Sequence, residues 1–286
     1  NALEDVTLDI HAGEVVGIAG VEGNGQAELV EVLMGIREPT AGTVHLEGTD
    51  ISDWDVRRIR EAGVGYIPED RHRQGLLLDA PLWENRMLGH QTQAPASRRG
   101  ILTPSDARAD TERIVAEYDV RTPGIHVTVG SLSGGNQQKL IIGREMSHAP
   151  KVLIASHPTR GVDVGAQAAI WDLIREARRE GLAVLLISAD LEELIGLSDT
   201  IKVILVDTGA YTPQVGVHQY LSDISSSARI AGPVTLTSKT TTGGAADAAD
   251  VTFTSVSGPS IEAIVIYMDT GTESTSPLIA FIDTAT

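Results

Sequence analysis

One short segment restricts the fold more than any other part of this chain. Val15–Ala19 is an apolar run, Gly20–Glu28 is rich in glycine, and the apolar residues of 29–35 recur at helical spacing up to a closing glycine. A strand, a glycine-rich loop and a helix in this order are typical of a loop that binds phosphate through backbone N–H groups. An ordinary glycine-rich turn between a strand and a helix is the alternative that this segment alone leaves open.

The side chains of this loop depart from the phosphate-binding pattern G-x-x-G-x-G-K-[ST]. We predict that nucleotide contacts fall on Gly20, Gly23, Asn24, Gly25, Gln26 and Ala27. Gln26 stands where the pattern requires a lysine, and Ala27 stands where it requires a hydroxyl that binds Mg²⁺. The backbone can still surround phosphates, but the neutralising cation and the metal-binding side chain are missing. The loop is therefore predicted to be degenerate.

A second motif is intact. Leu132-Ser133-Gly134-Gly135-Asn136-Gln137-Gln138-Lys139 places a serine and two glycines before the apolar run Leu140–Ile142. The pattern predicts a helix that begins at the serine. Free N–H groups and the positive end of the helix dipole suit such a start to an anion, above all a phosphate.

Two further apolar runs predict strands, and each is followed closely by residues of interest. Val152–Ile154 predicts a buried parallel strand, and Ser156 and His157 follow it closely. Val184–Ile187 predicts another strand, with Ala189 just beyond its end. Nothing in the sequence supplies His157 with a carboxylate or serine partner, so a structural role is preferred to catalysis.

Together these motifs resemble an ABC transporter. Residues 1 to about 204 resemble its nucleotide-binding domain, and more narrowly the second ATP-binding half of the fused ATPase subunit of bacterial simple-sugar and nucleoside importers. Four features carry the narrower resemblance: Gly23-Asn24-Gly25-Gln26, the segment 66–71 (Tyr-Ile-Pro-Glu-Asp-Arg), the asparagine of the 132–139 motif, and the segment 158–165 (Pro-Thr-Arg-Gly-Val-Asp-Val-Gly).

The resemblance implies a role for each motif. Ser156, His157, Asp163 and Ala189 hold the positions of the Walker B, D-loop and switch residues, of which only the D-loop acid is kept. Glu69, Asp70 and Arg71 hold the Q-loop position that couples to the permease, with a solvated charged turn as the alternative. Leu132, Ser133, Gly134, Gly135 and Gln137 form the signature, which acts on the ATP site of a partner domain.

The resemblance also implies partners and cofactors. The partner would be an N-terminal ABC domain with an intact P-loop, and it would hold ATP and most of the Mg²⁺. Permease subunits in the membrane, and indirectly a solute-binding protein, complete the set. No residue is predicted to be catalytic in cis, and no metal site is predicted on this chain. Each missing part can remove several kcal/mol of transition-state stabilisation, so turnover by this half alone is expected to be nearly absent.

The coarse pattern predicts an α/β fold with a parallel sheet for residues 1–204. Strands are expected near 4–10, 14–19, 44–46, 63–67, 151–155 and 182–188, and helices near 25–34, 54–60, 112–118 and 165–179. A mostly helical subdomain is expected at about 83–147, with 91–99 as a polar loop inside it.

The pattern changes near residue 205. Residues 205–286 are rich in Ser and Thr, and they hold strand candidates at 251–256, 261–268 and 278–282, separated by turn signals. We expect a small all-β meander in which 240–249 is a flexible link. This region weakly resembles a β-rich virion protein of tailed phages, so a fusion of two origins around 201–207 is one hypothesis and a divergent regulatory domain is the other. The alternative function is a structural or assembly β-protein joined to a non-functional ATPase remnant.

Composition excludes some classes of function. The net charge of −17 argues against a nucleic-acid partner. The absence of cysteine excludes disulfides and thiolate metal sites and fits a reducing compartment. No run approaches the roughly 20 apolar residues of a membrane span. The resemblance implies a cytoplasmic protein held at the inner face of the membrane through permease subunits.

Overall fold

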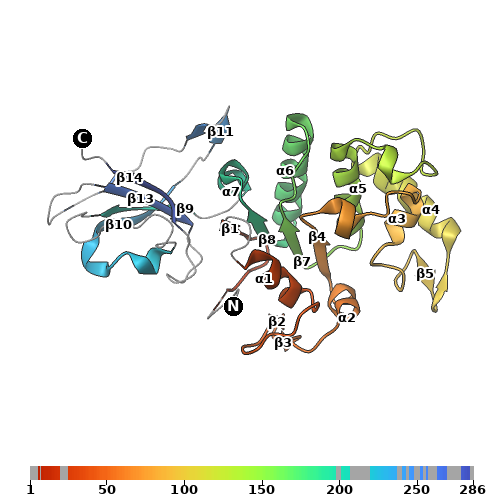
Figure 1. The fold of residues 1–286 in the computed structure, drawn as a ribbon, viewed down its shortest axis with the longest axis horizontal. Coiled ribbons are helices and arrows are strands. Elements are labelled where there is room, and N and C mark those ends of the chain that lie inside the picture. The colour runs from red at the N-terminus through yellow and green to blue at the C-terminus, as the bar shows by residue number, and fades with distance from the viewer. Residues whose placement is uncertain are drawn as a thin grey trace.

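A parallel sheet forms the centre of the N-terminal part (Figure 1). The computed structural model describes residues 6, 8–19, 25–197, 201–206, 220–236, 240–242, 245–247, 252–253, 256, 263–268 and 278–283. The sheet has four strands in the order β1 (Val15–Ala19), β8 (Ala183–Ser188), β7 (Val152–Ser156) and β4 (Val64–Ile67). All three pairings are parallel. The parallel α/β sheet that the sequence predicts is confirmed.

Both faces of this sheet are covered, which is why its strands read as continuous apolar runs. On β8, Leu185 and Ile187 belong to one buried cluster, while Val184 and Leu186 belong to another. The first cluster packs under α1 (Gln26–Leu33) and α2 (Val56–Glu61), next to the short hairpin of β2 (His45–Leu46) and β3 (Thr49–Asp50). The second packs under α5 (Gly134–Met146), α6 (Val164–Arg179) and α7 (Leu191–Leu197).

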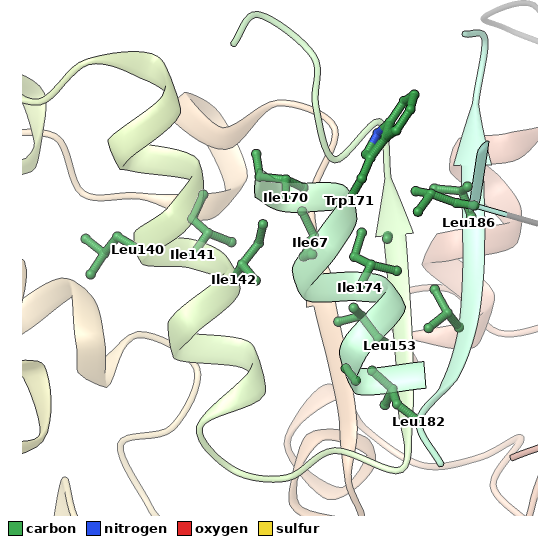
Figure 2. Packing of buried hydrophobic residues seen from close by; sticks show 14 of the residues in the cluster. Ile67, Leu140, Ile141, Ile142, Leu153, Ile170, Trp171, Ile174, Leu182 and Leu186 are labelled. Carbon is green, nitrogen blue, oxygen red and sulfur yellow. The ribbon is translucent and has the colours of Figure 1, made fainter. Parts of the chain in front are cut away.

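The helical subdomain lies beyond β4, at the right of Figure 1. It contains α3 (Leu82–Met87), α4 (Pro104–Glu117), α5 and the short turn η2 (Val129–Ser131). A π-helical turn, η1 (Arg71–Gly75), leads into it from β4. Figure 2 shows Ile141 and Ile142 of α5 pointing toward α6 and Ile67, while Leu140 points to the opposite side of the helix. Helix α5 thus joins the subdomain to the sheet.

Three local expectations need correction. Residues 6 and 8–10 lie outside any strand, and the rest of the strand expected at 4–10 lies outside the described residues. The expected loop 91–99 contributes β5 (Ser97–Arg98), which pairs with β6 (Ile101–Leu102). Helix α4 begins at Pro104 instead of near residue 112, because proline suits the first turn of a helix and α4 turns Ala107, Thr111 and Ile114 to the interior.

A second sheet follows α7 and lies at the opposite end of Figure 1 from the helical subdomain. Its order is β10 (Arg229–Thr235), β9 (Ile201–Val206), β13 (Ala263–Met268) and β14 (Leu278–Asp283), with every pairing antiparallel. Two short 3₁₀ turns, η3 (Leu221–Asp223) and η4 (Ser226–Ala228), pack on it through Leu221, Ile224 and Ala228. The change of sheet therefore falls at β9, a few residues before the expected boundary.

The C-terminal strands differ from a simple meander. Two expected strands coincide with β13 and β14, but β9 lies between β10 and β13, so sequence neighbours are not always sheet neighbours. Residues 252, 253 and 256 are not in a strand, and the rest of the strand expected at 251–256 lies outside the described residues. The expected flexible link holds a hairpin of β11 (Thr240–Thr242) and β12 (Ala245–Asp247).

Candidate functional site

The signature motif lies at the N-terminus of α5, as its pattern predicts. Ser133 is the N-cap residue, with extended backbone angles, and its side chain is exposed. Its Oγ accepts a hydrogen bond from Asn136 Nδ2 at 2.9 Å and a longer one from the Asn136 backbone N–H at 3.5 Å. The first turn of α5 carries no acidic residue. An exposed, uncharged helix start of this kind can accept an anion.

The two glycines of the motif are also required by packing inside the chain. A Cβ on Gly134 would lie 2.7 Å from Arg71 Nη2 and 2.8 Å from the carbonyl oxygen of Gly161. A Cβ on Gly135 would lie 2.7 Å from the Cβ of Ala166. Contacts below 3 Å cannot form without movement, so Gly134 allows the start of α5 to approach Arg71 and Gly161, and Gly135 allows it to approach the start of α6.

Gln137 points inward. It is 5% exposed, and its Nε2 donates to the carbonyl oxygen of Val129 at 3.2 Å. Its Oε1 accepts hydrogen bonds from His72 Nε2 at 2.9 Å and from Arg71 Nε at 3.3 Å. Leu132, also predicted as a signature residue, is buried. The exposed part of the motif is therefore Ser133 with the backbone that follows it.

The residues predicted at the Q-loop hold this region together. Asp70 caps η1, since its Oδ1 accepts from the backbone N–H groups of His72 at 3.1 Å and Arg73 at 3.2 Å. Glu69 forms an ion pair with Arg160. Arg71 Nη1 donates to the Arg160 carbonyl oxygen at 2.6 Å, beside the D-loop. The structure thus brings together the segments predicted to be the Q-loop, the D-loop and the signature helix.

The loop predicted to contact nucleotide is described only in part. Gly20, Gly23 and Asn24 lie outside the described residues. Gly25 precedes α1 with a φ of 99°, a left-handed conformation that favours glycine. Gln26 and Ala27 begin α1, and Ala27 is exposed. Its methyl group offers no oxygen to a metal ion.

At the carboxyl ends of β7 and β8, two of the positions predicted to be degenerate, His157 and Ala189, contact each other. His157 Nδ1 accepts a hydrogen bond from the backbone N–H of Ala189 at 3.4 Å, and the His157 backbone N–H donates to the Ile187 carbonyl oxygen at 2.8 Å. These contacts favour the structural role preferred for His157. Ser156, 5% exposed, is the last residue of β7 and supplies a neutral oxygen where a Mg²⁺ site needs a carboxylate. Ala27 and Ser156 together do not fit Mg²⁺.

The family model that matches this chain is that of the ABC transporter, over residues 3–160. The chain belongs to the ABC transporter family. It is 48% identical over 202 residues to the guanosine import ATP-binding protein NupO of Bacillus subtilis, covering 71% of this chain and 40% of that protein. It is 42% identical over 219 residues to the ribose import ATP-binding protein RbsA 2 of Streptomyces coelicolor, covering 77% of this chain and 42% of that one. The chain spans about 40% of the length of the curated relatives it matches.

Solved ABC structures share the fold. A dimeric ATP-binding cassette, MJ0796, in a post-hydrolysis state bound to ADP and Pi, matches with a TM-score of 0.59 and 23% identity over 68% of this chain and 83% of that one. A nucleotide-free cassette of an ABC transporter matches with a TM-score of 0.58 over 70% of this chain and 79% of that one. These matches show the P-loop NTPase fold of ABC ATPases. No helix within the described ranges combines the length and apolar character that crossing a membrane requires.

This ABC domain contains a buried cluster of ion pairs that the sequence did not predict. Glu145, near the C-terminus of α5, has a fully buried side chain that pairs with Arg60 at 2.7 Å and Arg144 at 2.8 Å. Burial alone would raise the pKa of Glu145, but the two guanidinium groups hold it well below its usual range. His90 lies beside this pair and stacks on His148, with ring centroids 4.0 Å apart. The available signal was the charged pair 144–145 inside the apolar face of the predicted helix.

A second missed group fixes the segment after β7. Glu193 of α7 is 1% exposed, and it accepts hydrogen bonds from Thr159 Oγ1 at 2.6 Å and Trp171 Nε1 at 3.3 Å. Burial raises the pKa of this carboxyl. Within the described part of the chain no lysine or arginine pairs with Glu193, and its hydrogen bonds connect α7 to the residues that precede the predicted D-loop. The sequence offered no signal for this contact, because three separate elements supply it.

Proposed function

We propose that this chain is an ATP-binding half of an ABC importer for simple sugars or nucleosides, and that it donates its signature to the ATP site of a partner domain. The observation that carries the proposal is a contrast. The start of α5 at Ser133 is exposed and capped, whereas five positions lack the side chains that the family motifs use for hydrolysis: Gln26, Ala27, Ser156, His157 and Ala189. The relatives are guanosine, nucleoside and ribose import ATP-binding proteins, which supports the substrate class.

The complete assembly follows from the same proposal. The partner domain would have an intact P-loop, bind ATP and hold the Mg²⁺, and present its nucleotide to Ser133, Gly134 and Gly135. Glu69, Asp70 and Arg71 would face permease subunits that hold the chain at the cytoplasmic face of the membrane, with a solute-binding protein as an indirect partner. Residues 1–204 would form the nucleotide-binding domain, with residues 205–286 as a region of separate origin.

The test is ATP turnover by this chain alone and in a mixture with an ABC half that has an intact P-loop. We expect almost no turnover by the chain alone and clear turnover in the mixture. Ser133→Arg should abolish the gain, because the side chain would occupy the space in front of the exposed helix start. Ser105→Arg, at another exposed serine on α4, is the matched control and should leave the gain intact.

Two results would overturn the proposal. Turnover by the chain alone would show that the degenerate site is catalytic. Silence in both samples would contradict signature donation and favour an ATPase remnant attached to a structural β-region.

A further inference from the structure

Arg71 lies where three segments of the chain meet. Its guanidinium donates to the carbonyl oxygen of Arg160 at 2.6 Å through Nη1, to that of Gly161 at 3.1 Å through Nη2, and to Gln137 Oε1 at 3.3 Å through Nε. The first two acceptors belong to the segment that ends at the D-loop acid, and the third belongs to the signature helix. A planar guanidinium can satisfy three acceptors arranged in this way, whereas a lysine ammonium is a point charge on a flexible stem.

Close packing around the Arg71 guanidinium, the junction of the three segments, leaves little room for movement. The space where Gly134 would carry a Cβ is 2.7 Å from Arg71 Nη2, and the corresponding space at Gly161 is 3.4 Å from the same atom. The guanidinium is therefore held between the first residue of α5 and the D-loop segment. One residue further along α5, Gly135 packs against Ala166 of α6.

The position of Arg71 is itself fixed by its neighbours. Asp70 caps η1, the turn in which Arg71 lies, and His72 Nε2 also donates a hydrogen bond to Gln137 Oε1 at 2.9 Å. The ion pair between Glu69 and Arg160 gives a second link between the Q-loop segment and the D-loop segment. A displacement of residues 69–71 would therefore be transmitted to both the D-loop and the start of α5.

We propose that Arg71 is a positioning residue that locks the start of the signature helix to the D-loop, so that Ser133 and Asp163 reach a partner domain as one rigid unit. This rests on the proposed function for its consequence, but the lock itself is a property of this chain alone. The guanidinium acts through the geometry of its three hydrogen bonds, and it does not bind the partner through its charge.

The experiment compares backbone amide hydrogen exchange in the full chain for wild type, Arg71→Lys and the matched control Arg57→Lys. Arg57 is an exposed arginine on α2 that pairs with Glu61. Arg71→Lys should accelerate exchange at 134–137 and at 161–166 together, by about tenfold or more, since charge-assisted hydrogen bonds at both segments are lost. Arg57→Lys should change neither segment. Unchanged exchange in Arg71→Lys, or a change at only one of the two segments, would overturn the proposal.

A second variant covers the case in which Arg71→Lys does not fold. Gly134→Ala leaves Arg71 in place but inserts a methyl group into the junction, and it should produce the same paired rise in exchange. In the mixture with an ABC half that has an intact P-loop, Arg71→Lys should lower maximal ATP turnover at least tenfold while the KM for ATP changes little. Retained turnover in Arg71→Lys would show that charge alone suffices and would overturn the positioning role. A paired rise in exchange together with a wild-type mixture that is silent would leave the lock established and reject the proposed function.

Discussion

The two ends of α5 are held in opposite ways. At its N-terminus, neutral hydrogen bonds, close glycine contacts and the single guanidinium of Arg71 support an exposed serine. Near its C-terminus, the side chains of Arg144 and Glu145 are 5% and 0% exposed and bind each other inside the protein. In the proposed function the N-terminal end presents a helix start to a partner, so it must stay accessible and its supporting contacts come from within this chain. An end that anchors the helix can bury its charges, provided that each is paired.

The largest expected effect is at the anchoring end. Glu145→Ala leaves Arg144 and Arg60 without their carboxylate in a buried site, and we expect it to lower the free energy of unfolding by about 3–5 kcal/mol. Urea unfolding measures this directly. Glu117→Ala removes an exposed carboxylate that pairs with Arg113 and should have no measurable effect. Equal effects of the two variants would remove the distinction between the ends of α5.

The next effect is at the presenting end. Gly135→Ala places a Cβ 2.7 Å from Ala166, and we expect a loss of about 1–2 kcal/mol after the gain in helix propensity is counted. Gly165→Ala, near the exposed start of α6, meets only Asp163 Oδ1 at 3.3 Å. It should be neutral or slightly stabilising in the same unfolding assay. If Gly135→Ala were as stable as Gly165→Ala, the glycine would serve the ligand and not the packing.

The anchoring end should also depend on pH. Burial, with help from His90 and Arg86, lowers the pKa of His148 to about 4 from its usual 6.5, although Asp110 and Glu145 oppose the shift. The unfolded chain therefore binds the proton first as the pH falls. The stabilisation is complete above pH 6.5 and is lost between pH 6.5 and 4. We expect on the order of 1 kcal/mol at this half-exposed ring once screening by solvent is allowed for.

Thermal unfolding at pH 7 and pH 4.5 tests this contribution. His148→Gln should unfold with a smaller difference between the two pH values than the wild type. An identical difference in both proteins would show that other groups carry the pH dependence.

A smaller effect is expected at the cap of α5. Ser133→Ala removes an exposed acceptor whose bond to the helix N–H is long, so the loss of stability should be about 0.5 kcal/mol, at the low end for N-caps. Turnover in the mixture with an intact ABC half should nevertheless fall at least tenfold. A large loss of turnover with only this small loss of stability would separate the function of Ser133 from its structural role. Proportional losses of turnover and stability would show that Ser133 acts only through the stability of the helix start.

The smallest effect is expected at His157, which follows β7 directly. His157 has a φ of 47°, and its ring accepts a weak hydrogen bond, at 3.4 Å, from the backbone N–H of Ala189. His157→Gly loses that contact but relieves the left-handed backbone, so stability should change by less than about 0.5 kcal/mol. Turnover by the chain alone should stay at its basal level. A clear change in turnover would give His157 a catalytic role.

The N-terminal fold was largely predictable because its signals are local. The apolar runs at 15–19, 152–154 and 184–187 became the parallel strands β1, β7 and β8, and the serine before two glycines became the start of α5. The C-terminal sheet was less predictable, since its order depends on β9 pairing with β10 on one edge and with β13 on the other. Periodicity identifies a strand, but it does not name the strand's neighbours.

The candidate site divides in the same way. The chemical groups can be named from the amino-acid sequence alone: an intact serine–glycine–glycine motif, and glutamine, alanine, serine and histidine where lysine, hydroxyl and carboxylates are expected. The folded structure was needed to show that Gln137 turns inward and that Arg71 joins two segments 66 and 90 residues away. It was also needed to show that Glu145 anchors α5 through buried ion pairs. Chemical identity is carried by each residue alone. Hydrogen bonds and excluded volume between distant segments exist only once the chain has folded.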